Sequence, residues 1–227
     1  MRNALWLFFD LGNTLVNEET AAECRIQRLV EALARYRRRC SFDEVQSAFQ
    51  QASAEFAPYL STRAIEILLA DPAGRRAVAA EARYPKELEV LYEGVGELLR
   101  VLSASYKLGV IANQSVSSTD RLTKWGLMPY ISNCLCSFEL GLEKPNPRIF
   151  QLALERARCS PSQTVMIGDR LDNDIRPARL LGWKTIRIMQ GFARFQSPRN
   201  SVDEADLTVA NLSELVPIFT RGLAQSS

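Results

Sequence analysis

A short apolar run near the N-terminus is the first element that the hydrophobic pattern predicts. Five consecutive apolar residues, Leu5–Phe9, end in a carboxylate, Asp10. A run this short and this rich in aromatic residues favours a buried strand over a helix, and Gly12 with Asn13 supplies the turn that ends it. Asp10 is therefore predicted at the carboxyl end of a strand, where open α/β sheets bind ligands. On this stretch alone, a local turn-capping role for Asp10 is an equally good interpretation.

The next part of the chain has apolar residues at helical spacing and no predicted strand. Leu29 and Leu33 lie one turn apart, and Ser41 followed by Glu44 has the pattern of a capping box. The predicted helices here are Thr20–Arg39, Ser41–Phe56, Thr62–Leu69 and Gly74–Arg83. This pattern predicts a helical bundle, residues 16–92, inserted after the first strand.

Beyond residue 96, short buried runs alternate with helical patterns. The predicted strands are Lys107–Ala112, Asn133–Ser137, Thr164–Ile167, Lys184–Ile188 and Leu207–Val209. The predicted helices are Glu97–Ser103, Ser118–Trp125, Pro147–Ala157, Asp174–Leu181 and Leu212–Arg221. Such alternation implies right-handed crossovers and a parallel sheet with helices on both faces. The sequence thus predicts an α/β protein with a doubly wound, Rossmann-like core, residues 1–15 and 93–227, and a surface loop over residues 190–205.

Composition excludes several classes of function. The 227 residues carry a formal charge of +2 with scattered basic side chains, which argues against a nucleic-acid or membrane-surface partner. Histidine is absent, so Ser-His-Asp catalysis and His-ligated metals are excluded. The five cysteines are an odd number without a C-x-x-C pair, as expected of free thiols in the cytoplasm. No segment is long enough to span a bilayer, and the oligomeric state is not indicated.

Polar side chains follow two of the predicted strands. Asn113 and Gln114 come directly after the strand that ends at Ala112, and the segment 168–174 after the next-but-one strand carries three aspartates, Asp169, Asp172 and Asp174. Carboxylates this close together repel one another unless a metal cation or a Lys or Arg side chain lies among them, so a divalent metal is one interpretation. Capping of the following helix by Asp172 or Asp174 is the alternative.

Four motifs follow one another along the chain: Phe-Asp-Leu-Gly-Asn-Thr-Leu at 9–15, Val-Ile-Ala-Asn-Gln at 110–114, Glu-Lys-Pro-Asn-Pro at 143–147 and Ile-Gly-Asp-Arg-Leu-Asp-Asn-Asp-Ile at 167–175. Together they resemble the motifs of the haloacid dehalogenase superfamily of hydrolases with a helical cap after the first motif. The resemblance covers essentially the whole chain. It implies a Rossmann-like core, with residues 16–92 as the cap.

The resemblance also implies a role for each matching residue. Asp10 would be the nucleophile that forms an aspartyl-phosphate, and Lys144 would balance its charge. Mg²⁺ would be bound by Asp10, Asp169 and the carbonyl of Gly12, with Asp174 in support. The predicted substrate-binding residues are Thr14, Asn113 and Gln114. The implied function is a phosphatase that acts on a small phosphorylated metabolite.

Two positions depart from the phosphatase pattern of this superfamily. Gly12 stands where a second Asp serves as general acid and base, and Ala112 stands where Ser or Thr contacts a phosphoryl oxygen. Acid–base assistance is typically worth roughly a hundredfold to ten-thousandfold in rate. One alternative is therefore a protein that binds Mg²⁺ and a phosphorylated ligand as a regulatory module. Another is haloacid hydrolysis, which needs no metal and is disfavoured by the acidic cluster. Phosphonate cleavage in a related branch needs a lysine from the cap that forms a Schiff base. It is disfavoured because Lys86, near the end of the predicted cap, is the only lysine between residues 16 and 92.

Overall fold

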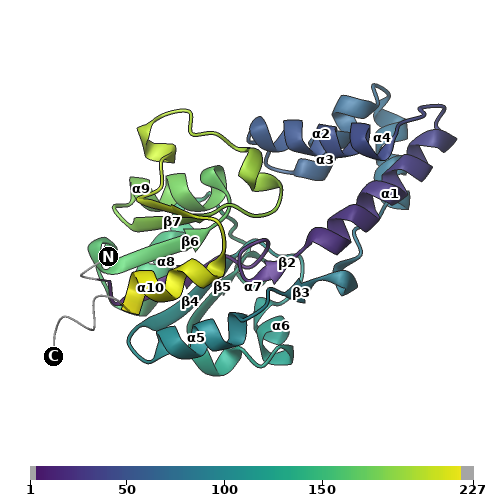
Figure 1. Ribbon diagram of the computed structural model, residues 1–227. Coiled ribbons are helices and arrows are strands. Elements are labelled where there is room, and N and C mark those ends of the chain that lie inside the picture. The colour runs from purple at the N-terminus through teal and green to yellow at the C-terminus, as the bar shows by residue number, and fades with distance from the viewer. Residues whose placement is uncertain (1–3, 221–227) are drawn as a thin grey trace. The chain divides into compact units, whose positions relative to one another are not determined.

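The computed structural model describes residues 4–220 and divides into two compact units. A sheet unit contains residues up to 16, residues 91–190 and the chain from 198 onward, and a helical unit contains residues 17–90 and 191–197. The elements of both units are labelled in Figure 1. No helix within residues 4–220 combines the length and the apolar character needed to cross a membrane.

The sheet unit is built on six parallel strands in the order β5-β4-β1-β6-β7-β8. Their bounds are β1 Trp6–Phe9, β4 Lys107–Ala112, β5 Ile131–Cys136, β6 Thr164–Gly168, β7 Lys184–Ile188 and β8 Leu207–Val209. Strand β1 lies between β4 and β6, and successive connections run outward from it in both directions. The predicted doubly wound parallel sheet is confirmed.

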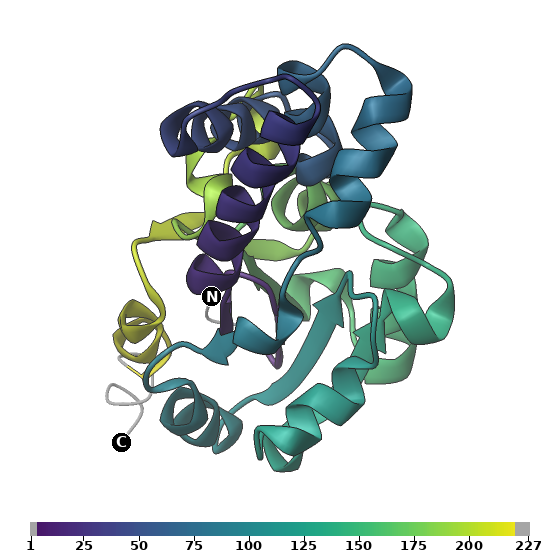
Figure 2. The ribbon, with the colours of Figure 1, turned by 90° about the vertical axis from the view of Figure 1, so that its right-hand side faces the viewer.

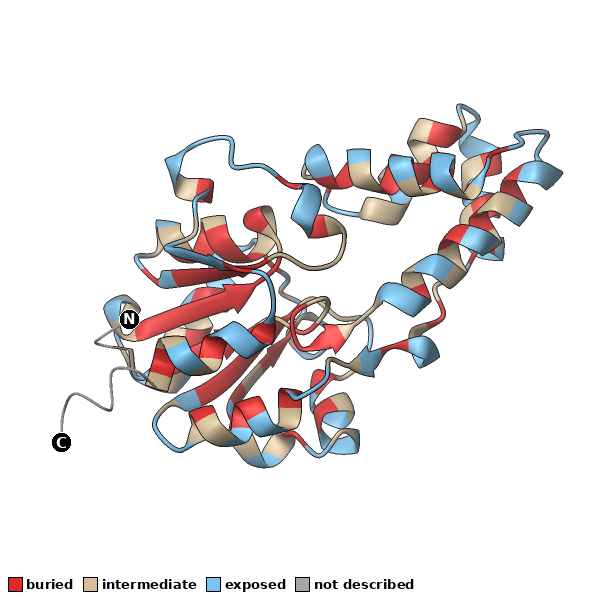
Figure 3. Ribbon diagram, viewed as in Figure 1, coloured by how far each residue is buried: buried red, intermediate tan, exposed pale blue. Residues whose placement is uncertain are grey.

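Side chains of β1 alternate between two hydrophobic cores, one on each face of the sheet. Leu7 and Phe9 belong to one core, and Trp6 and Phe8 belong to the other. All four residues of β1 are buried, and strands of the sheet unit are largely red, the colour of buried residues, in Figure 3. A strand that is buried on both faces needs apolar residues at every position, which explains the unbroken apolar run in the sequence.

The helices of the sheet unit cover both faces. Helices α5, α6 and α10 contribute to the core that contains Leu7, and α8 and α9 contribute to the core that contains Trp6. Their bounds are α5 Val95–Ser103, α6 Ser118–Lys124, α8 Pro147–Ala157, α9 Arg176–Leu180 and α10 Leu215–Thr220, with a short helix α7 at Ser137–Leu140. The predicted end of the last helix, Arg221, lies outside the described residues.

The helical unit contains four α-helices, whose purple to blue ribbons can be followed in Figure 2. They are α1 Glu19–Arg35, α2 Phe42–Ala54, α3 Leu60–Leu68 and α4 Pro72–Glu81. Helix α2 begins with the capping box expected from Ser41 and Glu44. The helical unit has its own hydrophobic core, which includes Ile26, Leu29 and Val45.

Residues 191–197 pack with the helices of this unit, although the sequence predicted a surface loop in the core domain. A 3₁₀ turn spans Phe192–Phe195, and the ring of Phe192 stacks on that of Phe49 at 5.3 Å between centroids. The hydroxyl of Ser53 donates a hydrogen bond to the carbonyl of Phe192 at 2.8 Å. These contacts are long-range in sequence, so a local pattern cannot reveal them.

Two further differences from the predicted elements are local. Short strands β2 Val16–Asn17 and β3 Val90–Leu91 pair with each other where the sequence predicted no strand. The helix predicted to begin at residue 174 instead starts with a π-helical turn, Leu171–Ile175. Pro177 has no N–H to donate to the carbonyl of Asn173, so a regular α-helical hydrogen bond is impossible there.

Candidate active site

Asp10 follows β1 directly and lies at the carboxyl edge of the sheet. Its backbone N–H donates to the carbonyl of Ile167 on β6 at 2.9 Å, which fixes Asp10 beside the end of that strand. The side chain is 13% exposed, so solvent and small molecules retain access to it. The carboxylate is thus a firmly positioned and accessible group.

Lys144 forms a buried ion pair with two carboxylates. Its Nζ lies 2.6 Å from Oδ1 of Asp10 and 2.5 Å from Oδ1 of Asp174, and its side chain is only 2% exposed. Burial by itself lowers the pKa of Lys144, but the charges of Asp10 and Asp174 outweigh it and raise the pKa above its ordinary value. The ammonium is therefore protonated at neutral pH and holds Asp10 and Asp174 together.

Asn113, at the end of β4, holds the backbone of Lys144 on both sides. The side-chain Oδ1 of Asn113 accepts from the Lys144 N–H at 2.7 Å, and Nδ2 donates to the Lys144 carbonyl at 2.8 Å. The sequence predicted that Asn113 contacts substrate. In the structure both polar atoms of its side-chain amide form hydrogen bonds with the backbone of Lys144. The sequence did not reveal this positioning role.

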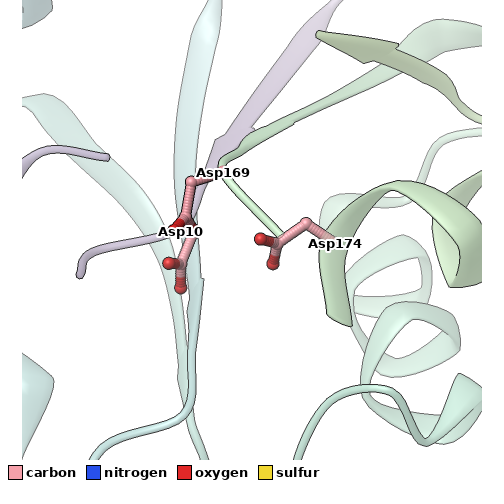
Figure 4. A group of neighbouring side chains, drawn as sticks. All are labelled: Asp10, Asp169 and Asp174. Carbon is pink, nitrogen blue, oxygen red and sulfur yellow. The ribbon is translucent and has the colours of Figure 1, made fainter. Parts of the chain in front are cut away.

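Asp169 and Asp174 follow β6 and are both buried. Figure 4 shows the side chain of Asp174 pointing from the π-helical turn toward Asp10 and Asp169. Asp174 folds back over Gly168, where an added Cβ would lie 2.5 Å from its Cγ. A glycine at 168 is therefore required for this close approach.

Asp172 has a different partner from Asp174. It forms an ion pair with the guanidinium of Arg170, and Nε of Arg170 donates to its Oδ1 at 3.0 Å. The Arg170 N–H donates to Oδ2 of Asp174, also at 3.0 Å. The residue that caps helix α9 is Ile175, without a side-chain bond, so neither aspartate is its N-cap.

The site concentrates negative charge in a buried place. Burial raises the pKa of Asp174, Lys144 opposes this rise, and the charge of Asp10 adds to it, so that the pKa reaches about 6. A cation close to Asp10 and Asp174 would favour their ionised forms. The electrostatics of these carboxylates therefore favour the binding of a cation.

Asp10, Asp169 and Asp174 fit the ligand set of a hard divalent cation. One carboxylate oxygen from each lies within 4.8 Å of the others. Asp10 accepts from Lys144 through Oδ1 only, and Oδ2 makes no hydrogen bond within residues 4–220. Carboxylate oxygens are the donors that Mg²⁺ prefers, and a few of them with water complete its shell.

The remaining residues predicted for the site lie in the neighbouring loops. Gly12 forms an isolated bridge with Val16 in the turn after Asp10. Thr14 is fully buried in that turn, with no hydrogen bond to its hydroxyl from the described residues. Gln114 is held by Arg121, whose Nη1 donates to its Oε1 at 2.6 Å. Contact of Thr14 or Gln114 with substrate remains a prediction.

A family model described as haloacid dehalogenase-like hydrolase matches residues 6–182. A glyceraldehyde 3-phosphate phosphatase of Methanopyrus kandleri is 29% identical over 93% of this chain and 95% of its own length. A protein of the same name from Pyrococcus furiosus is 26% identical over 97% and 95% of the two chains.

A solved structure shares the fold. The putative HAD-hydrolase YfnB of Bacillus subtilis, bound to magnesium, has a TM-score of 0.70 and 22% identity, over 95% of this chain and 98% of that one. At this level of identity the similarity establishes the fold alone. The family match spans most of the chain and includes Asp10 and Asp169, which follow strands, and Lys144, which lies in the loop between α7 and α8. This chain belongs to the haloacid dehalogenase-like hydrolases.

Proposed function

We propose that the protein is a magnesium-dependent phosphatase that hydrolyses small phosphate esters through a phosphorylated Asp10. The observation that carries the proposal is the accessible carboxylate of Asp10, held 2.6 Å from the buried ammonium of Lys144 beside Asp169 and Asp174. The phosphatase names of the relatives from Methanopyrus kandleri and Pyrococcus furiosus support it. The magnesium in the YfnB structure supports the choice of metal.

Asp10 performs the first step in this proposal. A carboxylate oxygen of Asp10 forms a bond to phosphorus as the bond from phosphorus to the ester oxygen breaks, and that oxygen leaves as an oxyanion that takes a proton from water. The ammonium of Lys144 keeps Asp10 ionised and oriented, and it offsets negative charge that develops on the phosphoryl oxygens. Water then attacks the phosphorus of the aspartyl-phosphate, which returns Asp10 and releases inorganic phosphate.

A metal at this site would be held by Asp10, Asp169 and the carbonyl of Gly12, with Asp174 in support. A bound Mg²⁺ would supply charge that lets one anion approach another. Asp174 itself is committed to Lys144 and Arg170 through both carboxylate oxygens. It therefore acts chiefly by holding Lys144 and by adding negative charge near the metal.

Gly12 limits the rate in this proposal, because a glycine cannot protonate a leaving alcohol or activate water. Esters with a good leaving group need little protonation in the first step, whereas attack of water on the aspartyl-phosphate still lacks a base. Introducing the missing carboxylate by Gly12→Asp is expected to raise turnover, toward the roughly hundredfold or greater factor of general acid–base catalysis.

Phosphate release from p-nitrophenyl phosphate and a panel of small phosphate esters tests the proposal. We expect hydrolysis that is abolished by EDTA, restored by Mg²⁺ and absent in Asp10→Asn. Activity that survives both EDTA and Asp10→Asn would refute it. Metal-independent release of halide from a haloacid would instead favour a dehalogenase.

The absence of an acid–base residue at Gly12 favours a second function, in which the site binds Mg²⁺ and a phosphorylated ligand without turning it over. Binding of Mg²⁺ without hydrolysis of any ester, combined with a large gain of activity in Gly12→Asp, would support this regulatory role. A loss of activity in Gly12→Asp would mean that the native site uses a route to which glycine is suited.

A further inference from the structure

Asp203 is a fully buried carboxylate of the sheet unit that lies outside the acidic cluster of the candidate active site. Its Oδ1 accepts from Nε of Arg176 at 2.5 Å, and its Oδ2 accepts from Nη2 of the same guanidinium at 2.9 Å. Two parallel bonds of this kind fix the orientation of an arginine as well as its position. The proposed reaction uses neither residue directly.

The loop that carries Asp203 forms an anchor for this ion pair. Oδ2 of Asp203 also accepts from the N–H of Arg199 at 2.9 Å, and the Asp203 N–H donates to the carbonyl of Asn200 at 3.0 Å. Burial alone raises the pKa of Asp203, but the hydrogen bonds from Arg176 and Arg199 outweigh it and hold the pKa below its ordinary value. Asp203 is therefore ionised at neutral pH and presents a fixed negative charge to Arg176.

Arg176 occupies the position that closes the π-helical turn Leu171–Ile175. Its backbone N–H donates to the carbonyl of Leu171, and this bond to the fifth residue back distinguishes a π-helical turn from an α-helical one. The side chain of the same residue is the one that Asp203 holds. The 3₁₀ turn Ser201–Asp203 packs against both the π-helical turn and α9. Arg176 thus joins the backbone of the π-helical turn to the anchor.

Asp174 takes its direction from this turn. Its Oδ1 lies 2.5 Å from Nζ of Lys144, and its backbone N–H donates to the carbonyl of Arg170 at 3.0 Å. If the Arg176 N–H paired instead with the carbonyl of Asp172, as in a regular α-helix, the turn would shift by one residue. One residue corresponds to a rotation of about 100° around a helix axis, so the side chain of Asp174 would turn away from Lys144.

We infer that Asp203 is a positioning residue of the candidate active site, which acts through Arg176 to keep the π-helical turn in the register that directs Asp174 at Lys144. Neither Asp203 nor Arg176 contacts the substrate, and both act on the turn that carries Asp174. The inference deepens the proposed function, and it rests on that function only for the expected effect on turnover.

A double-mutant cycle of thermal unfolding in EDTA tests this role without any reaction. The cycle combines Asp203→Asn, which weakens the hold on Arg176, with Lys144→Met, which removes the partner of Asp174. If Asp203 acts through Asp174, its substitution matters less once Lys144 is gone. The fall in Tm caused by Asp203→Asn should therefore be smaller in Lys144→Met than in the unmodified protein, by at least about 1 °C. A purely structural anchor would give the same fall in both backgrounds.

Asp206→Asn is the control within the same unit. The Asp206 side chain is 23% exposed and accepts from Nζ of Lys184 at 3.0 Å and from the Thr185 N–H at 2.9 Å. It lies beside the amino-terminal end of β7, whereas Asp10 and Asp169 lie at the carboxyl edge of the sheet. The fall in Tm caused by Asp206→Asn should therefore add to that of Lys144→Met, and kcat should be unchanged.

Steady-state kinetics with p-nitrophenyl phosphate and Mg²⁺ gives the second readout. Displacement of a positioning group lowers the rate of the chemical step more than the affinity for substrate. Asp203→Asn should therefore lower kcat about 10- to 100-fold and change KM less than about twofold. Arg176→Lys keeps the charge but loses the pair of parallel bonds, so it should lower kcat by a smaller factor. If Asp203→Asn did not fold, Arg176→Lys would carry both measurements.

Additive changes in Tm in the cycle would overturn the inference. A kcat of Asp203→Asn equal to that of Asp206→Asn, when the unmodified protein is active, would also overturn it. Failure of the proposed function gives a different pattern, in which the unmodified protein does not hydrolyse the ester. The unfolding cycle in EDTA then decides on Asp203 alone.

Discussion

Replacing Lys144 by Met removes the buried cation that joins Asp10 and Asp174 while it keeps an unbranched apolar stem. The ammonium lies 2.6 and 2.5 Å from the two carboxylates, and the Lys144 side chain is 2% exposed. Water therefore cannot take the place of the lost ammonium in the variant. Loss of one partner from a buried ion pair costs about 3–5 kcal/mol, because the other charge stays buried without compensation. At about 2–4 °C per kcal/mol for a chain of this size, the Tm falls by about 6–20 °C.

Lys184 provides a matched control for this experiment. It also pairs with an aspartate, Asp206, at 3.0 Å, but its side chain is 54% exposed. Exposed ion pairs contribute about 0–1 kcal/mol, so Lys184→Met should change the Tm only slightly. Thermal unfolding of the two variants and the unmodified protein in EDTA compares the buried and exposed pairs without interference from a metal.

The pH dependence of the loss follows from Asp174. Burial, opposed by Lys144 and reinforced by Asp10, already raises the pKa of Asp174 to about 6 in the folded protein, above its ordinary value. A raised carboxyl pKa means that the folded protein binds a proton more readily than the unfolded chain, so stability is gained as the pH falls through that range. Neutral Asp174 needs no cation, and the destabilisation by Lys144→Met should therefore shrink between pH 8 and pH 5. A loss that is equal to that of Lys184→Met, or that does not change with pH, would refute this reasoning.

Two further substitutions test how the site is positioned. Gly168→Ala places a Cβ within 2.5 Å of the Cγ of Asp174, so it should cost about 1–3 kcal/mol in stability and at least about tenfold in turnover. Gly96→Ala is the control, because a Cβ there meets nothing within 4 Å. It should leave turnover unchanged in steady-state assays and leave the Tm unchanged or raise it. Asn113→Ala removes both bonds to the Lys144 backbone, so kcat should fall with KM nearly unchanged; a rise in KM alone would mean that Asn113 contacts substrate instead.

The fold and the location of the candidate site were accessible from the sequence because parallel strands impose a simple rule. Each buried apolar run is followed directly by polar residues, and neighbouring parallel strands end at the same edge of the sheet. The proximity of Asp10 and Asp169 could therefore be predicted without knowing any long-range contact. The unbroken apolar pattern of β1 also predicted burial on both faces correctly.

Other features depend on contacts that a local pattern does not contain. Asn113 has the same appearance in the sequence whether its amide contacts a substrate or the backbone of Lys144. Residues 191–197 show no periodic pattern in the sequence, and the contacts of Phe192 with Phe49 and Ser53 are long-range.

Rapid-mixing kinetics with p-nitrophenyl phosphate and Mg²⁺ tests the central claim most directly, with Asp10→Asn as the comparison. That leaving group needs little protonation, so the first step should proceed despite Gly12, whereas hydrolysis of the aspartyl-phosphate should be slow. We expect a burst of p-nitrophenol that matches the enzyme concentration, phosphate bound to the peptide that contains Asp10, and neither in Asp10→Asn. A burst that persists in Asp10→Asn, or the absence of burst and turnover while Mg²⁺ still binds, would contradict the assignment of Asp10 as the nucleophile of a phosphatase.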